Sequence, residues 1–305
     1  MKKHLPQILL LFSSAFWGAS FIFTKGIFES DANITPLIII SARMFVASLV
    51  TIPVLLLSRS LEKIRRKDFL WFLLLAALEP FLYSICETSG ISHVSGSLAS
   101  IIIATIPLLI PFGMALAYKE KLKWRAVWGC ALSMLGIVIM SFGDSFTADD
   151  GWLGILLLSA AVIVAVLYTL TLVRFLNRYN PMTITAYQNL IALLYFLPLM
   201  LLCDGDKLPL VNFSPKIVFF LSFLGVFCST VAYMCFNYGM KRLGATAGSV
   251  YNNIIPVFSL LLALAIGQES LDFSELSSWY KLAGMAVVIV GLSLAQKKNG
   301  NGERI

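Results

Sequence analysis

Three ionisable residues lie inside long apolar stretches of this sequence, where a charge is costly and usually serves a function. Arg43 lies in the stretch 36–57, and Glu79 and Glu87 lie in the stretch 69–89. Tyr83 falls midway between the two glutamates, so a regular helix would place all three on one slowly turning stripe. Counting the rise per residue from the expected helix ends places Arg43 between the two carboxyl groups in depth.

These three charges have two interpretations. An ion pair of Arg43 with Glu79 or Glu87 would satisfy both partners and serve the structure alone. In the other interpretation Glu79, which precedes Pro80, is a functional group that binds a proton or a positively charged part of a substrate. Burial would favour this because it disfavours an unpaired charge. The residues alone leave both interpretations open.

Polar side chains in other apolar stretches indicate an internal cavity. Asn side chains at membrane depth need partners, so they face the interior of a helix bundle or a wet cavity. We expect some of the following to join helices and the rest to line the cavity: Tyr168, Tyr187, Gln188, Asn189, Tyr233, Asn237, Ser249, Tyr251, Asn252 and Asn253. Pro107 and Pro256 each remove a backbone donor within such a stretch, and each is a candidate hinge or a purely structural kink.

The apolar stretches have the length needed to cross a bilayer. Hydrophobic residues make up 59% of the chain and charged residues 13%, which is too little polar surface for a soluble globule. Runs of about 20 residues match the hydrocarbon thickness. The sequence predicts an all-α integral membrane protein, with the lipid bilayer as its surroundings. Ten transmembrane helices are expected, at 8–28, 36–57, 69–89, 95–117, 126–143, 152–173, 183–203, 216–238, 245–267 and 281–296.

The distribution of basic residues predicts the orientation. Of the 23 Lys and Arg residues, 18 lie at the termini or in connections that follow even-numbered helices. Short cytoplasmic loops retain such residues, so both termini are expected in the cytoplasm, with the protein in the plasma (inner) membrane. This bias also explains the net charge of +7 without a nucleic-acid partner.

One stretch of the sequence recurs later in the chain. Residues 90–122 align without gaps to residues 239–271, which pairs Pro107 with Pro256 and Glu120 with Glu269. The connection after the first copy is basic and that after the second is acidic. If each stretch belongs to a repeat of five helices, an odd number, the second repeat would enter the membrane inverted. Inverted repeats are common in secondary transporters. We expect two five-helix repeats, at 1–143 and 144–305.

The sequence argues against most other chemistry. It has no GxxxxGK[ST] motif for ATP hydrolysis, and its two His residues and the absence of HExxH and GxSG argue against an intramembrane enzyme. Its five cysteines form no CxxC, so neither a metal site nor a disulfide framework is expected. No cofactor is expected. A membrane channel or a non-transporting scaffold stays open as an alternative, because neither needs a reactive constellation.

Several motifs together resemble the EamA family of the drug/metabolite transporter superfamily. They are SSAFWGASFIFTKG in the first helix, PLIIISARMFVA in the second, SGSLASIIIATIPLLIPFGMALAYKEKL, and its later echo AGSVYNNIIPVFSLLLALAIGQESL. The resemblance covers almost the whole chain. It implies a central cavity lined by Trp17, Ser20, Tyr83, Ser100, Tyr168, Tyr233, Asn237 and Asn252. Arg43 matches the arginine of the family's second helix, and Glu120 and Glu269 match its helix-end acid; Glu79 and Glu87 depart from the family pattern.

Residues and resemblance together predict a secondary transporter of small organic metabolites, with amino acids among the expected solutes. We expect it to be an exporter that alternates access to a central cavity between the two repeats. The expected substrate-binding residues are Glu79 and the cavity residues implied by the resemblance, with Pro107 and Pro256 as hinges.

Overall fold

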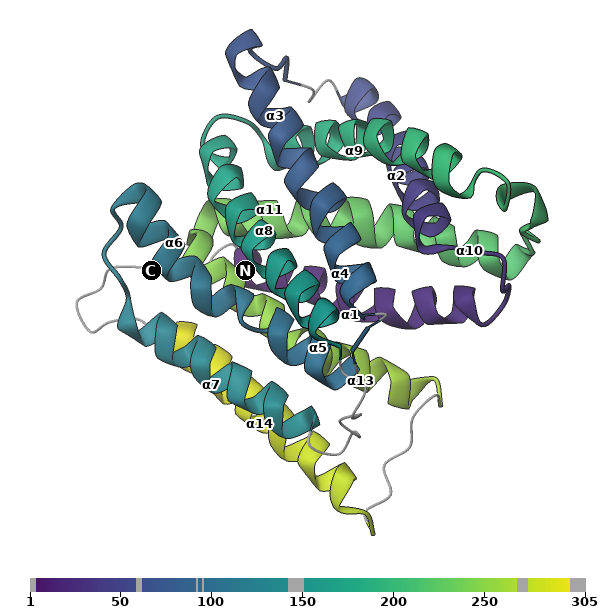
Figure 1. Cartoon of the computed structure of the whole chain (residues 1–305). Coiled ribbons are helices and arrows are strands. Elements are labelled where there is room, and N and C mark those ends of the chain that lie inside the picture. The colour runs from purple at the N-terminus through teal and green to yellow at the C-terminus, as the bar shows by residue number, and fades with distance from the viewer. Residues whose placement is uncertain are drawn as a thin grey trace.

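The computed structural model describes residues 4–58, 62–91, 93–94, 96–141, 151–267 and 274–296, and in this part of the chain all regular structure is helical (Figure 1). Ten helical segments are long and apolar enough to cross a membrane. The ten predicted helices are therefore confirmed, and their ends agree with the structure within five residues. One of the larger differences is at Leu243, because the helix continues through Lys241 and Arg242 until Gly244 ends it with a φ of +87°.

Six of the ten spans are continuous α-helices, and four are interrupted. The continuous spans are α1 (Leu5–Phe28), α2 (Pro36–Ser58), α7 (Trp124–Ser141), α8 (Trp152–Leu176), α9 (Pro181–Asp204) and α14 (Leu276–Gln296). The third span consists of α3 (Phe69–Ala76), the π-helical η2 (Ala77–Leu82) and α4 (Tyr83–Ile91). The fourth consists of α5 (Gly96–Ile103) and α6 (Ile106–Tyr118). The eighth consists of α10 (Pro215–Phe223), the π-helical η4 (Leu224–Val231) and α11 (Ala232–Leu243). The ninth consists of α12 (Ala245–Ser249), the 3₁₀-helical η5 (Val250–Ile254) and α13 (Ile255–Ala265).

The interruptions occur at corresponding places in the two halves of the chain. The third and eighth spans each contain a π-helical segment, and the fourth and ninth each break just before a proline. Pro107 is the second residue of α6 and Pro256 the second of α13. A helix accepts proline in its first turn because the N–H groups of that turn have no acceptor within the helix. The predicted interruptions at both prolines are confirmed, with each proline beginning a new helical segment.

The packing of the spans has the same correspondence. α2 packs on α9, and α7 packs on α14. α1 of the first half packs on α11 and α13, which belong to the eighth and ninth spans, while α8 of the second half packs on α4, α5 and α6 of the third and fourth. Each span of the first half thus makes the same contacts as the span five places later makes in the second half. The third, fourth, eighth and ninth spans therefore form much of the contact between the two halves.

Glycines allow α7 and α14 to lie side by side along one edge of the bundle (Figure 1). A Cβ atom added at Gly136 would lie 2.7 Å from the backbone oxygen of Gly284 and the backbone nitrogen of Val288. Backbone atoms cannot yield to it. We expect Gly136→Ala to lower the free energy of unfolding by about 1–3 kcal/mol through overpacking, measured as a lower thermal midpoint in detergent. Gly113→Ala is the matched control, since its Cβ would meet the ends of the Val166 and Leu170 side chains at 3.2 Å or more. Equal shifts for the two variants would contradict this explanation.

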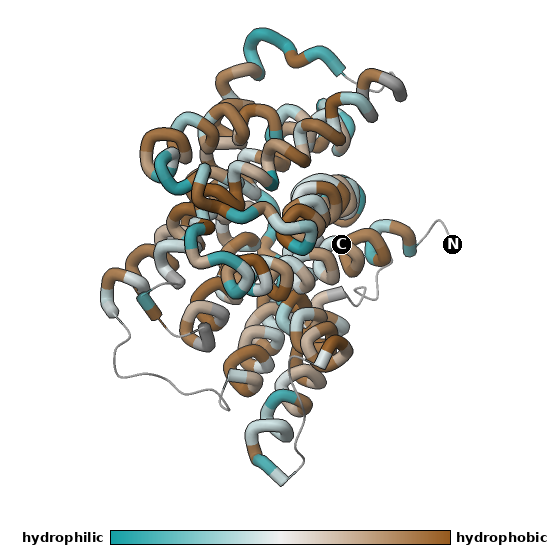
Figure 2. Tube along the Cα trace, turned by 90° about the vertical axis from the view of Figure 1, so that its right-hand side faces the viewer, coloured by the Kyte–Doolittle hydropathy of each residue, from teal (hydrophilic) through white to brown (hydrophobic). Residues whose placement is uncertain are grey.

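The outer surface of the bundle is strongly apolar, and Figure 2 shows hydrophobic residues along most of the helices. Leu116 is 88% exposed and Leu202 is 85% exposed, which only a lipid environment makes favourable. Five of the six Trp residues are exposed near the start of a span, as is typical of side chains at a membrane interface: Trp71, Trp124, Trp128, Trp152 and Trp279. Trp17 differs, because it is half-buried in the middle of α1.

At the predicted outer end, Asp31 joins the loop after α1 to the segment before α10. Its carboxylate accepts hydrogen bonds from the backbone N–H of Asn33 at 2.8 Å and of Asn212 at 2.6 Å. These donors hold the pKa of the Asp31 carboxyl below its ordinary value of 3.8. The ionised group therefore stabilises the folded protein above that value, and this contribution disappears as the pH falls through the lowered pKa.

We expect Asp31→Asn to unfold at a slightly lower temperature than the unchanged protein at neutral pH, because Asp31 is partly exposed in a loop, where water screens its charge and keeps the effect small. The difference should shrink as the pH falls below 3.8 and vanish once the pH is below the lowered pKa of Asp31 in the folded protein. Thermal unfolding of both proteins across this pH range checks it, and a difference that grows on acidification would show that the sign is wrong.

At the opposite, predicted cytoplasmic end, a network centres on Asp68 of the short 3₁₀ turn η1 (Arg66–Asp68) before α3. Its carboxylate accepts from Arg178 Nη1 at 2.9 Å and from the hydroxyl of Tyr179 at 3.0 Å. Both partners lie between α8 and α9. Lys241 Nζ at the end of α11 donates to the backbone oxygen of Tyr179 at 3.1 Å. This network ties the third, sixth, seventh and eighth spans together at one end of the bundle.

Candidate functional site

The candidate site lies where the π-helical segments of the third and eighth spans meet α9. Two neighbouring residues of α9 bind the interrupted backbones: Gln188 Nε2 donates to the carbonyl oxygen of Glu79 at 2.7 Å, and Asn189 Nδ2 donates to that of Ser229 at 3.1 Å. π-Helical segments release backbone groups from the regular ladder and are frequent at functional sites. In lipid these groups need partners from neighbouring helices. The two amides of α9 thus stabilise two matching breaks.

Glu79 occupies the break in the third span. Its φ of −138° and ψ of 124° are those of extended backbone, and the peptide bond to Pro80 is cis. The side chain is only 8% exposed. The Tyr233 hydroxyl of α11 donates to its Oε1 at 2.6 Å. Among the described residues no basic group lies within 4.0 Å of this carboxyl group, so Glu79 is a buried acid without an ion pair.

Aromatic rings surround the Tyr233 side of this carboxyl group. The Trp17 ring lies 5.1 Å from that of Tyr233 and 5.2 Å from that of Phe236, measured between centroids. Its Nε1 donates at 3.2 Å to the backbone oxygen of Cys228 in η4. On the other side, Gln188 Nε2 also reaches the Tyr168 hydroxyl at 3.4 Å. We call Trp17, Glu79, Tyr168, Gln188 and Tyr233 the Glu79 cluster; it draws on the first, third, sixth, seventh and eighth spans.

The predicted ion pair of Arg43 is not present in the structure. Arg43 Nε donates to Ser229 Oγ at 3.3 Å, and no ion pair within 4.0 Å joins it to Glu79 or Glu87. The ion pair was expected only because Arg43 and the two glutamates lie at similar depths. Because α2 packs on α9 and η4, the Arg43 side chain reaches the eighth span instead.

The predicted single stripe of Glu79, Tyr83 and Glu87 is also wrong. The backbone of Glu79 is not helical, so its side chain does not lie on the same helix face as those of Tyr83 and Glu87. The Tyr83 hydroxyl donates to Glu87 Oε1 at 2.8 Å, one regular turn along α4, whereas Glu79 turns to Tyr233. The two glutamates of the third span therefore bind different tyrosines, Glu87 the Tyr83 of its own span and Glu79 the Tyr233 of the eighth span.

Two amide oxygens at or beside the site lack partners within the described part of the chain. Gln188 Oε1 and Asn237 Oδ1 are buried acceptors without a hydrogen-bond donor. Asn237 is fully buried, and its Nδ2 donates to Thr185 Oγ1 of α9 at 3.1 Å. It follows Tyr233 by one turn of α11 and so faces the same side. Both oxygens are enclosed by protein atoms, so they belong to the packed surroundings of the site.

In the described part of the chain, the remaining predicted residues contact no side chain of the Glu79 cluster, and Ser20 reaches it only through the backbone of Trp17. Ser20 Oγ donates to the backbone oxygen of Trp17 at 2.7 Å, one turn back along α1. Asn252 is half-buried in η5. Glu120 is exposed after α6, and the Ser100 side chain and Glu269 lie outside the described residues. Their roles, and those of Pro107 and Pro256 as hinges, stay predictions.

Two contributors, Gln188 and Ser229, were not among the residues predicted to bind substrate. Gln188 had a visible signal, since it is an amide in an apolar stretch, but its partner depends on the break at Glu79. Ser229 is one small hydroxyl in an apolar run, and nothing in the sequence marks it.

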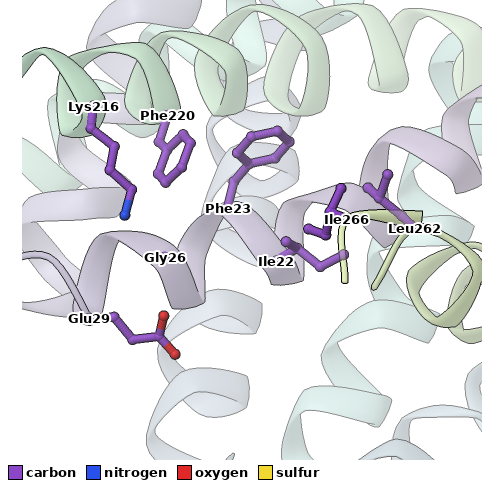
Figure 3. A pocket seen from close by; sticks show the side chains of 8 residues that line it. All are labelled: Ile22, Phe23, Gly26, Glu29, Lys216, Phe220, Leu262 and Ile266. Atoms are coloured by element: carbon purple, nitrogen blue, oxygen red, sulfur yellow. The ribbon is translucent and has the colours of Figure 1, made fainter. Parts of the chain in front are cut away.

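A separate pocket of about 280 Å³ lies near the predicted outer ends of α1, α10 and α13 (Figure 3). Phe23, Phe220 and other apolar side chains line it, with Glu29 and Lys216 at one end. Gly26 of its lining follows Trp17 by nine residues, about two and a half helical turns, and so lies on the opposite face of α1. The pocket is therefore distinct from the Glu79 cluster.

Ten apolar spans define a multi-pass membrane protein, and the Glu79 cluster between them is its candidate site. Comparison with known sequences goes further. The profile of the EamA-like transporter family matches residues 5–142 and 152–295, and the chain belongs to this family.

Its relatives include a protein described as an uncharacterized transporter of Archaeoglobus fulgidus, 27% identical over 98% of this chain and 100% of the relative. An S-adenosylmethionine/S-adenosylhomocysteine transporter of Chlamydia muridarum is 27% identical over 86% of this chain and 85% of its own length. A solved crystal structure superimposes with a TM-score of 0.77 at 19% identity, over 95% of this chain and 96% of the other, which shows that the fold is shared.

Proposed function

We propose that this protein is a secondary transporter that moves small organic metabolites by alternating access. The observation that carries the proposal is the Glu79 cluster, in which connected side chains from spans of both halves surround one buried acid. Tyr233 binds the carboxyl group of Glu79 and Gln188 its backbone oxygen, while Trp17 and Tyr168 contact these two residues. Secondary transporters place their substrate sites near the membrane midplane, at discontinuous helices between two repeats. The predicted solute-binding residues in this cluster are Trp17, Glu79, Tyr168 and Tyr233, with Tyr83 and Asn237 beside it.

The moving parts in this proposal are the two repeats, 1–143 and 144–305, related by inverted topology. The matching interruptions and the exchangeable packing of the spans support this division. The breaks before Pro107 and Pro256 are the proposed hinges, because neither break has a continuous helical ladder to resist bending. We also propose an inner-membrane location with cytoplasmic termini, on the distribution of basic residues, and transport directed outward.

Metabolites, amino acids among them, are the proposed solutes. The Chlamydia muridarum relative, whose name gives S-adenosylmethionine as its substrate, supports a small organic molecule. The three aromatic residues of the Glu79 cluster supply apolar faces for such a molecule, and its polar groups supply orientation.

Counterflow in proteoliposomes tests the proposal. Vesicles loaded with an unlabelled metabolite should accumulate the labelled metabolite transiently and saturably if the protein is a carrier. Efflux from everted and right-side-out vesicles then tests the direction. Flux that neither saturates nor responds to solute on the opposite side would indicate a channel. No flux of any solute through protein shown to be folded would favour a scaffold.

A further inference from the structure

We propose that the solute of the Glu79 cluster carries a protonated amine, whose N–H groups bind the free oxygen of the Glu79 carboxylate. This inference rests on the proposed transport function, but equilibrium binding tests it without requiring transport. It specifies a substrate class by charge and by hydrogen-bonding character.

The first argument is the missing counter-charge of Glu79. Glu79 lies in the central part of the third span, and no basic group of the described residues lies within 4.0 Å of its carboxyl group. The side chain of Arg43 donates to Ser229 instead. Charges at membrane depth pair with one another or serve a substrate. A positive charge on the solute would supply the missing partner.

The second argument is the state of the Glu79 carboxyl group itself. Its Oε1 accepts from Tyr233, and no hydrogen bond from a described residue reaches its Oε2. Oε2 is also absent from the fully enclosed polar atoms that lack a partner, so some of its surface borders open space. A cation can approach this oxygen while Tyr233 holds the other. Hydrogen bonds between ionised groups are the strongest that such a site can offer.

The third argument is the hydrogen-bonding character of this oxygen. An ionised carboxylate only accepts hydrogen bonds, and Tyr233 engages one of its two oxygens. A primary ammonium group offers three N–H donors to the other oxygen. A quaternary ammonium offers none, and a second carboxylate would add only acceptors. The site therefore favours an amine that keeps its hydrogens.

The aromatic residues complete the argument. The Tyr233 hydroxyl contacts the carboxyl group, and the Trp17 ring packs against the Tyr233 ring with 5.1 Å between centroids. A cation close to such rings gains additional attraction from their π-electrons. An aromatic wall beside a carboxylate thus recognises the charge of an amine and the apolar part that carries it.

Equilibrium binding to the purified full-length protein in detergent tests this with matched probes. Tyramine and tyrosol differ only by an ammonium group in place of a hydroxyl. 4-Amino-1-butanol and 1,4-butanediol repeat the comparison without a ring, and N,N,N-trimethyltyramine keeps the charge but lacks N–H donors. We expect each amine to bind about 10- to 150-fold more tightly than its neutral counterpart, the range for a charged hydrogen bond, and the trimethyl compound to bind more weakly than tyramine.

Glu79→Gln should reduce the tyramine-to-tyrosol ratio to near one, whereas Glu87→Gln should leave most of it. If Glu79→Gln protein fails to fold, the tyramine-to-tyrosol affinity ratio of the unchanged protein still decides whether the site selects amines. Neutral probes that bind as tightly as the amines, or no amine that binds at millimolar concentration, would overturn the proposal. Tight amine binding without counterflow would uphold it and contradict the transport function.

Discussion

Glu79→Gln is expected to lower the rate of saturable solute exchange by about 10- to 150-fold at limiting solute. Glutamine retains an oxygen that can accept from Tyr233, so the side chain keeps its contact and nearly its shape. What it loses is the negative charge at a position only 8% exposed. A charged hydrogen bond in such surroundings is worth about 1.5–3 kcal/mol, and the expected loss of exchange is that energy expressed as a rate.

Glu87→Gln is the matched control for this effect. Both acids lie on the third span, both accept from a tyrosine hydroxyl, and both variants exchange one oxygen for an amide nitrogen. Glu87 lies near the end of α4, about 12 Å further along a helical path, and contacts no member of the Glu79 cluster in the described structure. We expect it to keep most of the exchange activity. Full activity in Glu79→Gln protein would remove Glu79 from the site.

Tyr233→Phe separates position from charge. The change leaves the Glu79 carboxylate in place but removes the hydroxyl that holds its Oε1. If orientation of the carboxyl group matters, the variant should show a higher half-saturating solute concentration with a nearly unchanged maximal rate. The same counterflow assay measures both quantities.

The positions of the ten spans could be predicted because they follow from the lengths of apolar runs. Two of the four interruptions could also be predicted, since Pro107 and Pro256 cannot continue a helical ladder. The break in the eighth span contains no proline. It is accompanied by tertiary contacts, in which Trp17 and Asn189 take the backbone oxygens of Cys228 and Ser229. Local sequence does not encode those contacts.

The same distinction explains the candidate site. Glu79 was recognisable because an acid in an apolar stretch is rare, and Tyr233 and Asn237 because their spacing places them on one helix face. Their mutual arrangement was not recognisable. The partner of Arg43 depends on which helix α2 contacts and on how it is rotated, and residue counting gives only depth. The wrong stripe on the third span has a local cause, the extended backbone at Glu79.

Asp68→Ala is expected to have the largest effect on stability, lowering the free energy of unfolding by about 2–4 kcal/mol. The Asp68 side chain is 1% exposed and contacts Arg178 Nη1 at 2.9 Å. Its removal leaves the buried Tyr179 hydroxyl without its acceptor and the Arg178 guanidinium without its counter-charge. Arg178 is 40% exposed, so water compensates it in part, and the expected cost stays below that of a fully buried charge.

Glu29→Ala tests whether burial is the reason for the large loss of stability expected in Asp68→Ala. Glu29 also has a basic partner, Lys25 at 3.9 Å, but the two side chains are 57% and 73% exposed. Such a pair contributes about 0–1 kcal/mol, so this variant should unfold almost as the unchanged protein does. Thermal unfolding in one detergent compares the two directly. Because Asp68 ties the third span to the segment between α8 and α9, its loss should also speed proteolysis at that segment. Equal midpoints for the two variants would mean that this network holds the end of the bundle no more firmly than a surface ion pair.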